Sequence, residues 1–318
     1  MLVTGLGSMP GRDFRESTRM LVDLLPELLA WPELPARGVT SAMIGRTLGL
    51  LDLPCELSVD GWRMAGRPDA AQRRAKRWWS SDLDDFEELT QDHAGAVKVA
   101  LAGPWTLASS VRLSHPTMNH LIADAGACRD LAQALAEAAA ELSTRLAKRL
   151  GCRLIVQLDE PVIGAVVGAT LPTFSGLHRY PAPDPETIID SWRQIVSAVC
   201  AVDGVDGLWV HSCGPTMPAE LAARAGINGL SLDTRYLDSA LLDSCGTWLN
   251  DRGTVGLGIA RTDVVRVPSV DELTTAALGI LRVLELDAQL LMEHVVLTPA
   301  CGLAGWDDLS AARLLENL

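Results

Sequence analysis

The sequence predicts an α/β fold, a single (β/α)8 barrel that occupies residues 1–318 as one domain. One observation is that short runs of β-branched and aliphatic residues alternate with long amphipathic stretches, a pattern typical of a parallel sheet with helical crossovers. A second is that the chain has eight such runs in 318 residues, which is the number of strands and the chain length typical of a TIM barrel. An open, doubly wound sheet is the main alternative.

The eight candidate strands are short and apolar, and the intervals between most of them leave room for a helix. In chain order we expect them at Leu2–Leu6, Cys55–Val59, Val97–Ala102, Leu154–Leu158, Gly207–Val210, Gly229–Leu232, Thr254–Ile259 and Val295–Thr298. The stretches between them carry apolar residues at helical spacing, as in Arg129–Leu150 and Asp184–Val202. The βα unit is therefore expected to repeat around the barrel.

Composition and charge limit the partners of this chain. The formal net charge of −13 argues against nucleic acid or an anionic membrane as the main partner. No apolar run reaches the roughly 18 residues that a membrane helix needs, and the first residues lack the basic segment of a secretory signal. Seven cysteines without compact disulfide-like spacing indicate mostly free thiols. We therefore expect a soluble cytoplasmic protein.

Polar residues directly follow most of the predicted strands. The carboxyl ends of barrel strands meet at one mouth, where the active sites of such barrels lie, so these residues are expected to gather there. They are Gly7–Pro10, Gly103–Thr106, Asp159–Pro161, His211–Cys213, Asp233–Arg235, Arg261 with Asp263, and Cys301. Packing does not explain why apolar strands should end in such groups, and this agreement favours a catalytic mouth.

The residues after the fifth and eighth strands predict a metal site. His211 and Cys213 are two apart at a strand end, so their side chains point the same way. Cys301 follows the last strand, and the carboxylate of Asp233, one strand over from His211, can reach the same ion. Two thiolates, an imidazole and a carboxylate suit Zn²⁺ and not Mg²⁺ or Ca²⁺, which avoid thiolates.

At these residues the chain resembles the C-terminal catalytic barrel of the cobalamin-independent methionine synthase family, within the superfamily that includes uroporphyrinogen decarboxylase. The shared motifs are a Gly-Ser-x-Pro loop, a Gly-Pro-x-Thr turn, an Asp-Glu-Pro strand end, His-x-Cys, a carboxylate, and a Cys-Gly-Leu turn. They stand here as Gly7–Pro10, Gly103–Thr106, Asp159–Pro161, His211–Cys213, Asp233 and Cys301–Leu303. Each motif alone is weak, but all six occur in order along essentially the whole chain.

The resemblance implies methyl transfer to the thiol of homocysteine, forming methionine, at a zinc ion held by His211, Cys213, Asp233 and Cys301. Ser8 would hold the carboxylate of the amino acid. Asp159, the expected catalytic residue, would hold its ammonium group, with Glu160 beside it in the substrate site. Trp105 is expected either to stack on a flat donor ring or to fill a structural position. Zinc would keep the acceptor thiol deprotonated, since a free thiol is mostly protonated at neutral pH.

Three departures from the family pattern leave the methyl donor open. Asp233 is one methylene shorter than the Glu usual at that position, so it would need a closer strand or a bridging water. The classical folate enzymes carry an N-terminal barrel that has no counterpart here. They also have an Asp-x-His element after the seventh strand, where this chain reads Gly258–Asp263 without histidine. The donor is therefore expected to be methyltetrahydrofolate or a methylcorrinoid carried by a partner protein.

Three alternatives remain open. The acceptor could be another small thiol, such as coenzyme M. A metal-independent decarboxylase of the uroporphyrinogen type would need basic residues at the mouth, for which Arg12, Arg235 and Arg261 are the candidates. A degenerate barrel with a purely structural zinc is the third, although paired Cys-x-x-Cys knuckles are absent from the sequence.

Overall fold

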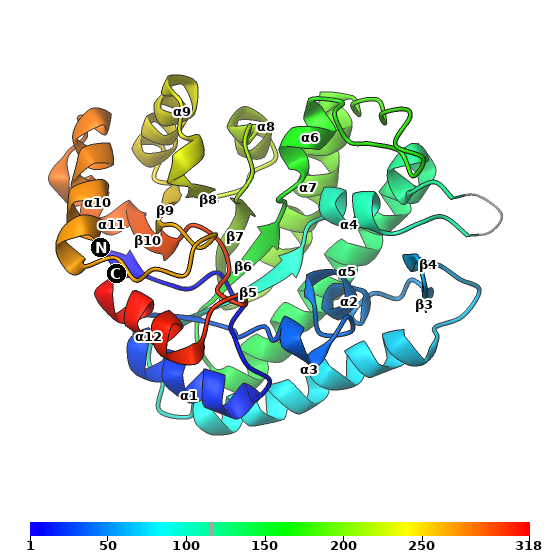
Figure 1. Ribbon diagram of the computed structural model, residues 1–318, viewed down its shortest axis with the longest axis horizontal. Coiled ribbons are helices and arrows are strands. Elements are labelled where there is room, and N and C mark those ends of the chain that lie inside the picture. Colours follow the sequence, from blue (N-terminus) through cyan, green and yellow to red (C-terminus); the bar gives the residue numbers. More distant parts are fainter. Residues whose placement is uncertain (115–117) are drawn as a thin grey trace.

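Parallel strands in a nearly closed barrel form the centre of the computed structural model, which describes residues 1–114 and 118–318 (Figure 1). The main sheet has eight strands in the order β1-β10-β9-β8-β7-β6-β5-β2, and every ladder in it is parallel. These strands are β1 Leu2–Val3, β2 Leu28–Ala30, β5 Ala96–Ala102, β6 Leu154–Asp159, β7 Val205–Ser212, β8 Gly229–Asp233, β9 Thr254–Ala260 and β10 Val295–Pro299. The predicted (β/α)8 barrel is confirmed.

The barrel closes between β1 and β2 through the segments that follow them. Ser8 and Glu33 form an isolated parallel bridge, in which the Met9 amide donates to the Glu33 carbonyl at 2.8 Å. The Thr4 hydroxyl adds a bond of 2.9 Å to the carbonyl of Leu28. The loop after β1 is therefore fixed at the carboxyl mouth of the barrel.

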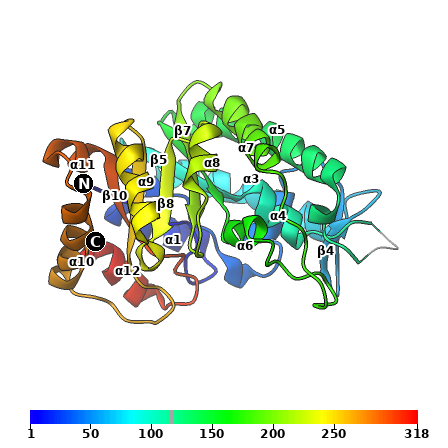
Figure 2. The ribbon, with the colours of Figure 1, turned by 90° about the horizontal axis from the view of Figure 1, so that it is seen from above.

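Helices surround the strands in both views, and the two termini lie near each other beside α10 and α12 (Figure 2). The α-helices are α1 Phe14–Leu24, α2 Met43–Leu48, α3 Ala70–Leu89, α4 Pro104–Ser110, α5 Ala125–Leu150, α6 Ile163–Val167, α7 Pro185–Cys200, α8 Ala219–Arg224, α9 Ser239–Asn250, α10 Val270–Leu284, α11 Ala288–His294 and α12 Asp308–Asn317. Three short 3-10 turns are η1 Pro35–Arg37, η2 Leu121–Ala123 and η3 Thr234–Tyr236. None of the described helices is both long and apolar enough to cross a membrane.

Many of the acidic residues have a structural use at helix N-termini. An aspartate side chain accepts a hydrogen bond from the first turn of α1, α3, α5, α7, α9, α11 and α12. Such N-caps satisfy amides that have no partner within the helix, and the negative charge interacts favourably with the helix dipole. Helix α4 has no side-chain cap from its own N-cap residue, Gly103, which becomes important below.

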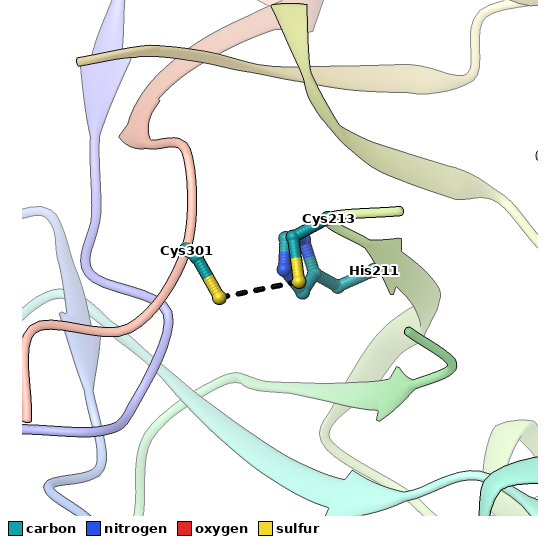
Figure 3. Close-up of side chains that lie close together, drawn as sticks. All are labelled: His211, Cys213 and Cys301. Atoms are coloured by element: carbon teal, nitrogen blue, oxygen red, sulfur yellow. Dashed lines mark hydrogen bonds between the residues drawn. The ribbon is translucent and has the colours of Figure 1, made fainter. Parts of the chain in front are cut away.

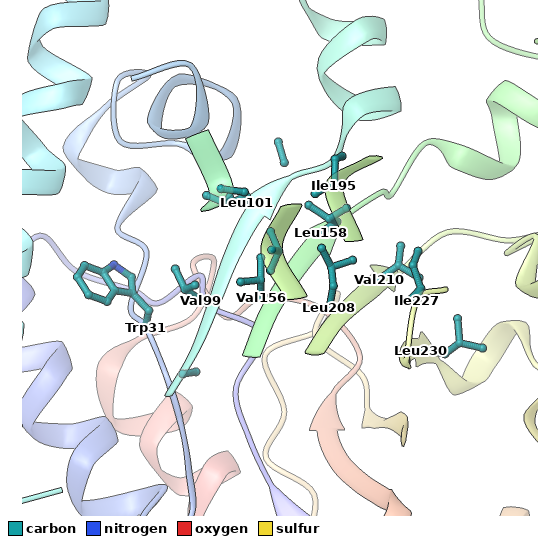
Figure 4. Close-up of a cluster of buried hydrophobic side chains, with 14 of the residues drawn as sticks. Trp31, Val99, Leu101, Val156, Leu158, Ile195, Leu208, Val210, Ile227 and Leu230 are labelled. Carbon is teal, nitrogen blue, oxygen red and sulfur yellow. The ribbon is translucent and has the colours of Figure 1, made fainter. Parts of the chain in front are cut away.

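The main core lies between the sheet and the helices. Alternate residues of β5, β6 and β7, such as Val99, Val156 and Leu208, point outward into this layer, where Ile195 of α7 also packs (Figure 4). The remaining residues of each strand face the barrel interior. A separate apolar cluster of Leu28, Trp209 and Val296 occupies the amino end of that interior. Polar side chains replace it toward the mouth.

One predicted strand forms but lies outside the barrel. Residues 55–58 form β3 (Cys55–Ser58), which pairs in antiparallel fashion with β4 (Gly61–Met64) in a separate two-stranded sheet. The chain reverses just before Gly61, whose φ of +107° favours glycine, so no helical crossover follows β3. The second barrel strand is instead β2, which has three residues and was not predicted. The other seven predicted strands belong to the barrel.

Candidate metal and substrate site

The side chains of His211, Cys213 and Cys301 meet at the mouth of the barrel (Figure 3). His211 is the next-to-last residue of β7, and Cys213 directly follows that strand. Cys301 lies in the turn after β10. One ring nitrogen and both Sγ atoms lie within 4.8 Å of one another. The two sulfurs are 3.2 Å apart and share one hydrogen bond. Residues 88 positions apart in the chain therefore form one cluster.

The neighbouring strand fixes the tautomer of His211. Its Nδ1 lies 3.1 Å from the carbonyl oxygen of Ser231 on β8 and 3.1 Å from the Ser231 hydroxyl. Because a carbonyl can only accept, Nδ1 carries the proton and Nε2 keeps its lone pair. Nε2 is buried and has no hydrogen-bond partner among the described residues. Metal-ligating histidines typically donate a hydrogen bond of this kind from the ring nitrogen that does not bind the metal.

The donor set fits a zinc ion. A neutral imidazole nitrogen and two thiols are ligands that Zn²⁺ prefers, and a buried nitrogen without a partner is costly unless something coordinates it. The contact between the two sulfurs lowers the pKa of Cys301 and raises the pKa of Cys213. The two sulfurs, 3.2 Å apart, can therefore both approach one cation, and the thiolate is the form of cysteine that binds it.

Asp159 lies beside this cluster at the end of β6, and its strand register pairs it with His211. Burial raises the pKa of Asp159. Gln157 donates to its Oδ1 at 2.7 Å, and the ammonium of Lys98 donates to Gln157 at 2.6 Å. Lys98 is fully buried, and burial lowers its pKa to about 8. A chain of polar groups thus runs from the barrel interior to Asp159.

Ser8 lies across the mouth from Asp159, packed against the turn that carries Cys301. The Leu303 amide donates to the Ser8 carbonyl at 2.7 Å. A Cβ on Gly302 would lie 2.6 Å from the Cβ of Ser8, so only glycine allows this approach. Ser8 and Cys301 are therefore positioned by the same two loops.

Glu33 is a residue of this site that the sequence analysis missed. It follows β2, forms the bridge with Ser8, and its buried carboxylate accepts a hydrogen bond of 2.6 Å from Arg46. Burial raises the pKa of Glu33, and the Arg46 charge opposes the rise. The apolar run at residues 28–31 that ends in Pro32 and Glu33 was the available signal, but it is too short to be recognised as a strand.

The structure holds Asp233 apart from the three clustered ligands. Its carboxylate accepts hydrogen bonds from the side chain of Arg235, from Nη2 to Oδ2 at 2.6 Å and from Nε to Oδ1 at 3.1 Å. Arg235 in turn donates to Asp263 at 2.8 Å, and Arg261 donates to Asp263 at 2.9 Å. The predicted fourth ligand thus belongs to a chain of ion pairs across the ends of β8 and β9.

Glu160 and Trp105 face the helical layer. The Glu160 carboxylate accepts from the amides of Trp105 and Thr106, at 3.0 and 2.8 Å, and from the Thr106 hydroxyl at 2.7 Å. It therefore supplies the cap that α4 lacks, and burial raises its pKa to about 7. The indole of Trp105 is buried and donates to Ser191 of α7 at 3.0 Å. These contacts support the structural alternative for Trp105 and give Glu160 a structural role.

Comparisons with known proteins agree with this fold. Sequence comparison with curated proteins gives no significant match. A B12-independent methionine synthase from Shewanella sp. W3-18-1 has a similar fold, with a TM-score of 0.60 and 12% identity over 99% of this chain and 94% of that one. A methyltransferase from Methanosarcina mazei is similar with a TM-score of 0.59 and 14% identity, over 95% and 82% of the two chains.

The family assignment rests on sequence. The family described as "Cobalamin-independent synthase, Catalytic domain" matches residues 86–318, which include Asp159, His211, Cys213 and Cys301. That match covers most of the chain and supports an enzyme that transfers methyl groups. The chain therefore belongs to the cobalamin-independent methionine synthase catalytic-domain family.

Proposed function

We propose that this protein is a zinc-dependent methyltransferase that transfers a methyl group to the thiol of homocysteine and so forms methionine. The observation that carries the proposal is the buried Nε2 of His211, which has no protein partner among the described residues and belongs to a cluster with two thiols. Family membership supports methyl transfer, and the donor set supports zinc. His211, Cys213 and Cys301 would hold the ion.

The residues of the mouth have separate tasks in this proposal. Bound zinc would supply a means of keeping the acceptor thiol deprotonated at neutral pH. Asp159 binds the ammonium group of the amino acid, since Gln157 engages only one of its oxygens. Ser8, on the opposite loop, binds the carboxylate. Two such contacts fix the substrate sulfur in line with the incoming methyl group, and alignment of this kind accounts for much of the rate of a transfer reaction.

The methyl donor is methyltetrahydrofolate or a methylcorrinoid on a partner protein. The loop after β9 has Arg261 and Asp263, which pair with each other, and no histidine that could protonate a folate leaving group. This feature favours neither donor by itself. It does mean that protonation of a folate would need a group from elsewhere in the site.

The metal-independent decarboxylase is less well supported. It would need several free cations at the mouth for its substrate carboxylates. Of the three candidates, Arg12, Arg235 and Arg261, two are paired: Arg235 with Asp233 and Asp263, and Arg261 with Asp263. It would also leave the Cys213–Cys301 pair without a use.

The experiment is a zinc determination on the purified protein, combined with methionine formation from homocysteine using methyltetrahydrofolate and methylcobalamin in parallel. Coenzyme M replaces homocysteine in a matched reaction. One zinc per chain with turnover of homocysteine supports the proposal and identifies the donor. Turnover of coenzyme M alone would reassign the acceptor, and a protein that binds no zinc would contradict the proposal.

A further inference from the structure

The carboxylate of Asp233 is fully occupied by protein groups. The Arg235 amide and Nε donate to Oδ1 at 3.0 and 3.1 Å, and Nε and Nη2 donate to Oδ2 at 3.0 and 2.6 Å. The side chain of Asp233 has no exposed area. Both oxygens therefore have charged, short-range partners before any metal is considered.

The local backbone explains why Arg235 reaches Asp233. Asp233 ends β8 and is the N-cap of η3, where its side chain accepts from the amide of Arg235. This turn brings the guanidinium back over the carboxylate two residues earlier. Turning Asp233 toward the metal cluster would break the cap and the ion pair together.

Arg235 is itself held from the other side. Asp263 accepts from Nη1 of Arg235 and from Nη2 of Arg261, so four alternating charges form one network with no net charge. Among the described residues, which include Asp233, only His211, Cys213 and Cys301 form a group of three or more possible ligands whose ligand atoms lie within 4.8 Å of one another. Asp233 is also one methylene shorter than a glutamate, which limits how far it can extend.

We propose that Asp233 is not a zinc ligand in this protein and that Arg235 retains its carboxylate, so that zinc is held by three protein ligands. The inference rests on the proposed function in presuming that His211, Cys213 and Cys301 bind zinc. Two thiolates and a neutral imidazole balance the charge of Zn²⁺. One coordination position then stays available to the thiol of the substrate, with no carboxylate to be displaced.

The test is the zinc dissociation constant, measured by competition with a chromophoric chelator on the full chain. Asp233→Asn is compared with Asp263→Asn, a matched variant that removes an equal charge from the same arginine. We expect the two dissociation constants to agree within tenfold, whereas Cys301→Ser, which removes a ligand, should weaken zinc more than 100-fold. Loss of an outer partner of a metal ligand costs 10- to 100-fold, so the tenfold limit also excludes an indirect role.

Weakening of zinc by more than tenfold in Asp233→Asn relative to Asp263→Asn would overturn the inference and leave the proposed function standing. Wild-type protein that binds no zinc would instead overturn both. If Asp233→Asn fails to fold, Asp233→Asn with Arg235→Gln, which removes the pair of charges together, is compared with the wild type. The same tenfold limit then decides the result.

Discussion

Substitution of Gly302 by alanine tests whether the loop that carries Ser8 positions the substrate. Gly302 lies between Cys301 and the Ser8 loop, and the Leu303 amide holds that loop at 2.7 Å. An added Cβ would lie 2.6 Å from the Ser8 Cβ and 3.2 Å from its Oγ. The substitution therefore pushes on Ser8 without removing any polar group.

The magnitude follows from the geometry. An ordinary contact needs 3.4 Å, so the two loops must separate by about 0.8 Å. Misplacement of about 1 Å costs on the order of 100-fold in rate, and overpacking costs about 1–3 kcal/mol of stability. We expect kcat/KM for homocysteine to fall roughly 10- to 100-fold, with a lower kcat because the substrate sulfur is misaligned. The assay is steady-state kinetics on zinc-saturated protein, with thermal unfolding as a check on folding.

Gly305→Ala is the matched control, because a Cβ at Gly305 meets nothing within 4 Å. It lies in the same segment and should leave kcat/KM unchanged. A folded Gly302→Ala protein with kcat/KM equal to that of the control would refute the positioning role of the Ser8 loop. A loss of zinc as large as the loss of kcat/KM would also refute the positioning role, because the added methyl group would then have displaced Cys301 and not Ser8.

The remaining predictions concern the end of β6 and the helix that follows β5. Asp159→Asn should raise KM for homocysteine more than it lowers zinc content, and equal losses would place Asp159 among the metal ligands. Trp105→Phe should lose the bond to Ser191 and about 1 kcal/mol of stability in urea unfolding, with KM for the donor unchanged; a higher donor KM would restore the stacking alternative. Glu160→Gln should destabilise the protein more at pH 5 than at pH 8. Burial raises the pKa of Glu160 to about 7, above its value in the unfolded chain. At pH values between these two pKa values the wild type takes up a proton on folding, so its free energy of unfolding decreases as the pH rises toward 7. The glutamine variant cannot titrate and lacks this pH-dependent contribution to stability. An equal loss of stability at both pH values would contradict the raised pKa of Glu160.

Long, contiguous strands were predictable from the sequence, and the three-residue strand β2 was not. The runs that became β5 to β10 have five to eight residues each, and their apolar character is uninterrupted enough to exclude a surface helix. Strand β2 has three residues and gains its stability from the neighbouring strand β5, a tertiary contact that no local pattern reveals. The run at Cys55 has strand composition, and only the turn at Gly61 decides that it forms a hairpin.

The same distinction applies to the candidate site. The spacing of His211 and Cys213 predicts a shared direction, and the barrel brings Cys301 to the same end. The alternation that directs Asp159 inward also directs the next residue outward, so the capping position of Glu160 could have been predicted from the sequence. The contact between Arg235 and Asp233 could not, because it depends on a 3-10 turn and on the position of Asp263 one strand away.

Charge balance in the mouth explains why such an arrangement is stable. The barrel interior holds the carboxylates of Glu33 and Asp159 together with the cations of Arg46 and Lys98, and buried charges are tolerated only when compensated in this way. A zinc ion with two thiolates adds no net charge to this interior. Coordination by Asp233 would add a negative charge to the zinc site and leave Arg235 paired only with the exposed Asp263. In the proposed function, the ion pair at the end of β8 would therefore keep the zinc site neutral before the substrate thiolate binds.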